Sequence, residues 1–395
     1  MKRLAVLVLL ATVLSRPALA ADDGPPSADV QKAINSGAGW LRARFSGEFE
    51  DATFHDTVEL LVLTLSHTGA NLEDKVYAKA IKALEKIEPR FTYRTALLAM
   101  ALNEVNPRLY RKKLTHCAQW LVDTQLKEGE WGYPGPPNVQ GKAPQGLSVP
   151  APYEPEAPAP DPGMAGEPGM AGPPGKPAAK PSERIKIEHG TTLYAGDTAK
   201  GDFSNTQFAI LGLRACRDAG IDVPPDVWKN ALGYLKKYQR KDGGFGYVMT
   251  GAQDESSYAS LTCAAICSAV ICLNASGAKD PKSDTIVTRA LAWMKTHGDI
   301  DVNNGVDMSS IIGPSTWQYY HLYSLERAGR VLAVADVGGK SWYGPGAKWL
   351  LSTQKGDGHW EDTYKDDPAP SYLSIADTCF ALLFLTRATR PLTGG

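Results

Sequence analysis

Two kinds of apolar pattern alternate along the chain. Segments such as residues 77–87, "YAKAIKALEKI", place apolar residues three and four apart, which is typical of a helix with one face in water. Segments such as residues 376–385, "ADTCFALLFL", carry a Thr and then a nearly unbroken apolar run, which predicts a helix buried on all sides. Their alternation predicts six helical hairpins, each with an amphipathic outer helix and an apolar inner helix. The hairpins span residues 28–68, 72–105, 108–219, 225–274, 283–328 and 341–389.

These hairpins predict a closed ring rather than a row of separate domains. The chain of 395 residues exceeds the roughly 250–300 residues that one conventional core supports. Repeats avoid that limit, because each hairpin packs only on its neighbours and a ring leaves no end uncapped. We therefore predict an all-α fold, an (α/α)6 toroid that forms a single domain over residues 21–395 and is a monomer.

A second repeat marks the ends of three outer helices. It reads Gln, three residues, Gly, one residue and an aromatic residue, and it occurs at Gln125/Gly129/Trp131, Gln239/Gly243/Phe245 and Gln354/Gly358/Trp360. Gly allows the positive φ of a helix exit turn, and the Gln amide can bond the backbone groups that the turn leaves free. With the Thr-led apolar helices, these QW-type elements resemble the repeats of the squalene cyclase and protein prenyltransferase superfamily. The resemblance spans nearly the whole chain after residue 20, apart from one insertion, and implies the same toroid.

The insertion, residues 132–200, interrupts the third hairpin and is rich in Pro and Gly. It holds 15 of the 28 prolines, and five glycines from Gly163 to Gly175 follow a triplet period. Five triplets are too few for a stable collagen-like triple helix, so we expect a flexible, disordered loop. Such a loop offers a docking segment for a partner protein.

The N-terminus predicts export. Met1–Arg3 precede an apolar run from Leu4 to Leu14 and then Ala18, Leu19 and Ala20, which is typical of a secretory signal peptide over residues 1–20. The run is too short for a membrane anchor, so we expect a periplasmic or secreted protein with no transmembrane segment after cleavage. The remaining chain has 39 Lys and Arg against 43 Asp and Glu, without the basic tract that favours a nucleic-acid partner.

Six cysteines in an exported protein raise the question of disulfides. Cys263, Cys267 and Cys272 lie at helical spacing within one apolar segment, where the geometry for bridging is poor. We therefore predict buried thiols that act as small apolar side chains.

Candidate chemistry lies at the N-terminal ends of the inner helices. In a toroid these ends face one mouth of the ring, where helix dipoles favour anions and acceptor groups. The shared Thr, replaced by Gln318 in one helix, aligns the preceding residues at this mouth, with His55 beside the first of them. They are Asp56, Arg94, Asn205, Leu261, Trp317 and Asp377. The candidates for proton transfer are His55, Asp56 and Asp377, and those for ligand binding are Arg94, Asn205, Trp317 and Tyr320. Asp or Asn before a helix also caps it, so a purely structural role stays open.

The resemblance implies chemistry that this sequence matches only in part. The cyclases carry an acidic motif, DxDDT, whose middle Asp protonates the substrate, whereas "SIADT" here retains only Asp377 and Thr378. The prenyltransferases bind zinc through an Asp, a Cys two residues later and a distant His. Asp377 and Cys379 match that first pair, but no His follows His359. We therefore expect neither a metal nor a cofactor.

These observations favour a non-catalytic binding or scaffold protein, whose ring holds an apolar small molecule or docks a protein partner. The alternative is an enzyme of isoprenoid chemistry, similar to the terpenoid cyclases, or of glycan chemistry. In that alternative His55, Asp56 and Asp377 handle protons at the mouth of the cavity.

Limited proteolysis of the purified protein tests the predicted loop. We expect cleavage only within residues 132–200, because an extended segment enters a protease active site and a packed helix does not. Mass spectrometry of the fragments locates the cleavage sites. Protection of this stretch in a trimeric species would instead support the collagen interpretation.

Overall fold

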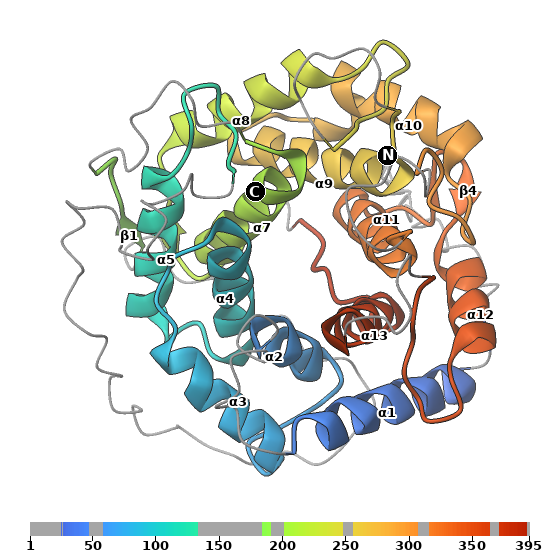
Figure 1. Cartoon of the computed structure of the whole chain (residues 1–395). Coiled ribbons are helices and arrows are strands. Elements are labelled where there is room, and N and C mark those ends of the chain that lie inside the picture. Colours follow the sequence, from blue (N-terminus) through green and yellow to red (C-terminus); the bar gives the residue numbers. More distant parts are fainter. Residues whose placement is uncertain are drawn as a thin grey trace, which may run out of the picture.

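The computed structural model describes residues 25, 27–46, 58–132, 184–190, 201–247, 256–306, 316–363 and 371–392. Within these ranges, twelve α-helices alternate between an outer and an inner ring (Figure 1). The outer helices are α1 (Ser27–Arg44), α3 (Lys75–Lys86), α5 (Arg111–Asp123), α8 (Pro225–Tyr238), α10 (Thr285–His297) and α12 (Tyr343–Thr353). The inner helices are α2 (Val58–His67), α4 (Thr92–Val105), α7 (Phe203–Asp218), α9 (Ala259–Ala275), α11 (Gln318–Leu332) and α13 (Ser371–Leu385). The six predicted hairpins and the toroid are confirmed.

The inner ring is closed. Each inner helix contacts the next one along the chain, and α13 contacts α2, so the sixth hairpin lies beside the first. The apolar runs explain this placement: every residue of α9 from Ala259 to Leu273 is buried. Without a neighbour on each side, such a helix would expose apolar surface to water.

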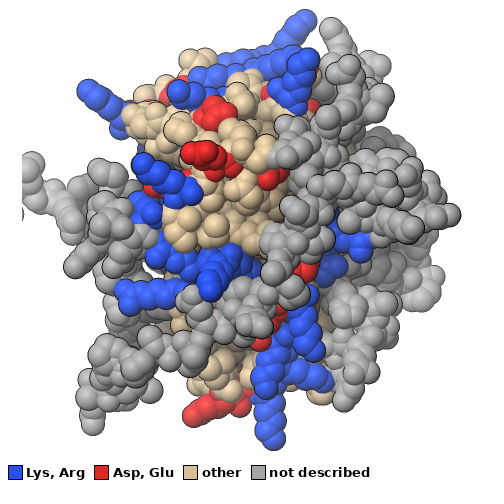
Figure 2. Space-filling view, turned by 90° about the vertical axis from the view of Figure 1, so that its left-hand side faces the viewer, with Lys and Arg blue, Asp and Glu red and all other residues tan. Residues whose placement is uncertain are grey.

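The outer helices bury one face only. In α3 the buried residues Tyr77, Ala80, Ile81 and Leu84 follow the spacing of one helical stripe. Figure 2, seen from the side of α3 and α5, shows Lys and Arg side chains spread over this outer wall. None of the described helices is both long and apolar enough to cross a membrane.

Short strands complete the described structure. β1 (Ile185–Lys186) pairs in parallel with β2 (Ile221–Asp222), and β3 (Asp336–Val337) pairs antiparallel with β4 (Lys340–Ser341). β1 belongs to the insertion, which is therefore not one continuous loop. Through β1, the described residues 184–190 pair with β2, the strand that follows α7 in the chain. The rest of the insertion, residues 133–183 and 191–200, lies outside the described residues, as does the predicted signal peptide.

The Gln of the repeated Gln–Gly–aromatic element joins consecutive outer helices. Gln354 Nε2 donates to the carbonyl of Gly358 (2.8 Å), within its own exit turn, and to the carbonyl of Ala33 (3.0 Å) on α1. This pair of bonds links α12 to α1 and closes the outer ring. Equivalent pairs of bonds run from Gln125 to Gly129 and Val227, and from Gln239 to Gly243 and Ile286.

The aromatic residue of the element joins its outer helix to the following inner helix. The backbone N–H of Trp360 donates to Oγ1 of Thr378 (3.1 Å), the shared Thr of α13. The indole of Trp360 donates to the carbonyl of Leu350 (2.9 Å) and is fully buried. The equivalent backbone bonds join Trp131 to Thr206 and Phe245 to Thr262. The shared Thr is thus a contact between the two rings.

Gly358 allows the exit turn of α12 to lie close against α1. Its φ is +103°, and a Cβ at this position would lie 2.7 Å from the carbonyl oxygen of Ser36. We expect Gly358→Ala to destabilise the protein by about 2–4 kcal/mol, because both the backbone strain and the clash act at the ring closure. Urea unfolding followed by circular dichroism measures this loss.

Gly356→Ala is the matched control, because a Cβ at Gly356 meets nothing within 4 Å. It should change the free energy of unfolding by less than about 0.5 kcal/mol. Equal effects of the two substitutions would show that the contact between α12 and α1 does not govern stability.

Candidate functional site

Arg94 and Asn205, two of the predicted mouth residues, each bond a neighbouring acidic side chain. Arg94, near the start of α4, donates through Nε to Glu59 Oε1 on α2 at 2.8 Å, and Glu59 is fully buried. Asn205 donates its backbone N–H and its side-chain amide to Asp202, which caps α7. Burial raises the pKa of Asp202 above its ordinary value. His55 and Asp56 lie outside the described residues.

Asp377 does not cap its helix, so the capping interpretation is wrong for this residue. α13 begins at Ser371, and Asp377 lies in its second turn with 6% of its surface exposed. Its Oδ2 accepts the backbone N–H of Asp362 (3.0 Å). Asp362 in turn accepts the backbone N–H of Gln318 (3.0 Å), the first residue of α11. Asp377 therefore positions a turn that supports the neighbouring inner helix.

Cys379, which with Asp377 matches the first pair of the prenyltransferase zinc motif, is fully buried. Burial raises the pKa of its thiol to about 12, which keeps the sulfur protonated at neutral pH. In the described ranges, no three His, Cys, Asp or Glu side chains are arranged to hold a metal ion. All six cysteines are buried and unpaired, which confirms the prediction of apolar thiols.

An aromatic cluster lies at the centre of the inner ring. Its members are Tyr93 of α4, Phe208 of α7, Tyr320 and Tyr323 of α11, and Phe380 of α13. The Tyr93 and Phe208 rings meet edge to face at 4.5 Å, and the Tyr323 and Phe380 rings stack at 5.4 Å. Tyr320, predicted from sequence as a ligand-binding residue, lies 5.7 Å from Phe380. Trp317, also predicted as a ligand-binding residue, is not one of these cluster members. It lies just before α11, with its backbone in the left-handed region at a φ of 58°.

Arg327 inserts a positive charge into this aromatic cluster. Its guanidinium carbon lies 4.2 Å from the centre of the Tyr323 ring, 5.4 Å from Phe208 and 5.7 Å from Tyr320. Only 1% of the residue is exposed. Nη2 donates to Oε1 of Gln207 (3.1 Å) on α7 and to Oγ of Ser324 (2.8 Å). Arg327 therefore reaches from α11 across the ring to α7.

Sequence reasoning missed Arg327, although the pattern contained a signal. Tyr320, Tyr323 and Arg327 are three and four residues apart, which places them on one face of α11. A charged side chain on the face of an inner helix that carries the cavity aromatics is a candidate for function, because burying an unneeded charge is costly.

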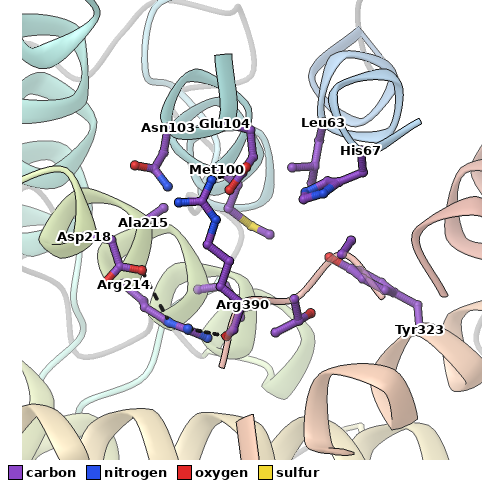
Figure 3. Close-up of a pocket in the computed structure, with 13 residues that line it drawn as sticks. Leu63, His67, Met100, Asn103, Glu104, Arg214, Ala215, Asp218, Tyr323 and Arg390 are labelled. Atoms are coloured by element: carbon purple, nitrogen blue, oxygen red, sulfur yellow. Dashed lines mark hydrogen bonds and ion pairs between the residues drawn. The ribbon is translucent and has the colours of Figure 1, made fainter. Parts of the chain in front are cut away.

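A pocket opens at the opposite mouth, where the inner helices end (Figure 3). Its volume is about 60 Å³, which suits a few waters or a small polar group. It is lined by charged and apolar side chains that include His67, Glu104, Arg214, Asp218, Tyr323 and Arg390. Arg390 reaches across the pocket to Glu104, where Nη2 and Oε2 lie 2.6 Å apart.

The C-terminal segment after α13 is tied across this mouth. Glu326, fully buried on α11, accepts the backbone N–H of Thr389 (2.9 Å) and its hydroxyl (2.7 Å). Arg330 donates to the carbonyl of Thr389 (2.9 Å), and Arg214 donates to that of Pro391 (3.1 Å). Burial raises the pKa of Glu326 to about 7, although the bonds from Thr389 and the nearby arginines oppose that shift.

Comparison with known proteins supports the fold. No family model matches the sequence, and no curated protein matches it. Among solved structures, the chain is similar to the type II terpene cyclase MstE from Scytonema. The enzyme without ligand gives a TM-score of 0.51 at 10% identity, over 91% of this chain and 98% of that chain. Two variants in complex with geranylgeranyl dihydroxybenzoate give TM-scores of 0.51 and 0.52 at 11% identity, over 91% of this chain and 97% of theirs. The fold is therefore that of a terpenoid cyclase-like helical toroid, as the resemblance implied.

The raised pKa of Glu326 predicts a pH-dependent stability. The folded-state pKa of about 7 exceeds the ordinary 4.5, so the folded protein binds more protons in this interval. Stability should fall as the pH rises from about 4.5 to 7, by up to about 3 kcal/mol. Glu326→Gln keeps both contacts to Thr389 and should not show this loss. Urea unfolding midpoints at several pH values compare the two proteins, and parallel pH profiles would contradict the assignment to Glu326.

Proposed function

We propose that the protein binds an apolar, isoprenoid-like ligand at the centre of its ring and does not cyclise it. The pocket of about 60 Å³ is smaller than such a ligand, so the proposal requires the central side chains to move apart when the ligand enters. The observation that carries the proposal is the central cluster of rings from four inner helices with Arg327 among them. Aromatic faces give favourable surroundings for an apolar chain, and ligand sites in helical folds commonly lie between inner helices. Support also comes from the similar solved structures, which hold a geranylgeranyl compound.

The position of Arg327 argues against cyclisation. In a cyclase of this class, aromatic faces in the cavity would stabilise the positive charge that develops on the substrate. Here the faces of Tyr323, Phe208 and Tyr320 already attract a permanent cation. A second positive charge a few ångströms away would be repelled, and the repulsion is strong in a site without water. Binding of an apolar chain meets no such penalty.

The candidate acids at the mouth where the inner helices begin also argue against cyclisation. Asp377 accepts a backbone N–H, so its carboxylate has a structural task. Ser374 and Ala376 stand where the cyclases carry the other two acids of their motif, and neither side chain is an acid. A neutral His55 is too weak an acid to protonate an alkene.

The second candidate is a terpenoid cyclase-like enzyme. The observation that favours it is the shared fold with type II terpene cyclases. In such an enzyme Asp377, with His55 and Asp56, would handle protons at the mouth formed by the starts of the inner helices. Export with cleavage after Ala20 and a monomeric state are further parts of our proposal, as is docking of a protein partner through the insertion.

Geranylgeraniol, a C20 isoprenoid alcohol, tests the two candidates. We expect one molecule to bind per chain in native mass spectrometry and the same alcohol to be recovered after incubation. Asp377→Asn should leave this stoichiometry unchanged and lower the free energy of unfolding by about 1 kcal/mol, because a charge-assisted hydrogen bond becomes a neutral one.

Asp301→Asn is the control for that substitution, since Asp301 is exposed. It should change the free energy of unfolding by less than about 0.5 kcal/mol. A cyclised product from the wild type that disappears in the folded Asp377→Asn variant would establish the enzyme instead. Absence of any bound isoprenoid would refute both candidates.

A further inference from the structure

We propose that the centre of the ring contains a site for an anionic head group, a carboxylate or a phosphate, bound by Arg327 and Gln207. This inference rests on the proposed function, because the head group belongs to the apolar ligand. It adds the chemical class of that ligand and the two residues that recognise it.

The first step is an excess of buried donors. Nε and Nη1 of Arg327 and Nε2 of Gln207 are buried and have no hydrogen-bond partner. The orientation of the Gln207 amide follows from its neighbour: arginine can only donate, so the amide oxygen faces Arg327 and the amide nitrogen is left over. All three atoms are N–H donors, and the unpartnered group beside them that can accept is the uncharged hydroxyl of Tyr320. One neutral hydroxyl cannot serve three donors, so the cluster lacks a charged acceptor.

The second step concerns charge. The guanidinium stays protonated in any protein environment, and no carboxylate in the described ranges forms an ion pair with Arg327. The adjacent Glu326 uses both of its oxygens for Thr389. The aromatic faces offset part of the cost of burying this cation. An anion would supply the missing acceptor and the missing counter-charge together.

The third step is access. Tyr323 lies between the pocket and the donor cluster. It lines the pocket at the mouth where the inner helices end, and its ring centre lies 4.2 Å from the guanidinium carbon of Arg327. The pocket and the donor cluster thus share the side chain of Tyr323, which Figure 3 shows beside the pocket. Around the donors lie the rings of Phe208 and Tyr320, which suit an apolar chain rather than a hydrated free ion. The surroundings therefore favour an amphiphile over an inorganic anion.

Three ligands with the same C20 chain test the proposal: geranylgeraniol, the corresponding carboxylic acid and the corresponding monophosphate. Isothermal titration calorimetry measures the dissociation constant of each. We expect at least one of the two anions to bind about tenfold or more tightly than the alcohol, because its oxygens accept charge-assisted hydrogen bonds. Whichever anion binds more tightly identifies the head group as carboxylate or phosphate.

Two variants locate the preference. Arg327→Met should bring the affinity for the anion to within about threefold of that for the alcohol, while alcohol binding changes little. Gln207→Glu places an internal carboxylate beside Nη2, so it should abolish the preference in the same way and raise the unfolding midpoint. If Arg327→Met fails to fold, Gln207→Glu decides alone. Arg330→Met, three residues along α11 and outside the cluster, is the control that should keep the wild-type preference.

The outcomes separate this inference from the proposed function. Equal binding of alcohol and anions by the wild type overturns the head-group site and leaves the isoprenoid site intact. Retention of the anion preference in Arg327→Met or Gln207→Glu also overturns it. Binding of none of the three ligands refutes the proposed function and this site with it.

Discussion

The structure depends on a glutamine amide that donates to a carbonyl in the exit turn of its own outer helix and to a carbonyl on the next outer helix. No hairpin of this chain can bury its apolar inner helix alone, so the hairpins must be kept at a fixed spacing around the circle. Gln354 sets that spacing where the chain closes on itself, between Gly358 and Ala33. Gly is required beside it, since a Cβ at Gly358 would collide with the carbonyl of Ser36. The hydrogen bond from Gln354 to Ala33 can form only because Gly358 lets the exit turn lie close to α1.

Most of the fold could be predicted because its period is visible in the sequence. Amphipathic and wholly apolar segments alternate, and each kind has only one place in a ring where its apolar surface is covered. The partner of the glutamine could not be predicted, because the carbonyl of Ala33 lies more than three hundred residues away. The role of the shared Thr was also hidden. The residue before it looked like a cap, whereas at three inner helices Thr206, Thr262 and Thr378 make the contact to the outer ring.

The candidate site was harder to predict, because its chemistry depends on contacts across the ring. Tyr320 could be selected from the aromatic content of its helix, and it does lie in the central cluster. Gln207 could not, since an amide in an apolar helix carries no sign of what it faces. Arg327 contradicts the expectation that charged side chains lie at the surface. Only its spacing from Tyr320 and Tyr323 on one helical face indicated otherwise.

A ring of aromatic side chains can serve two opposite purposes, and the charge among them decides which. Without an internal cation, the electron-rich faces are available to a positive charge that develops on a bound substrate. With Arg327 in place, the same faces stabilise the protein itself, and the field at the centre favours an anion. This is why similarity of fold, even over nine tenths of the chain, leaves the reaction undetermined.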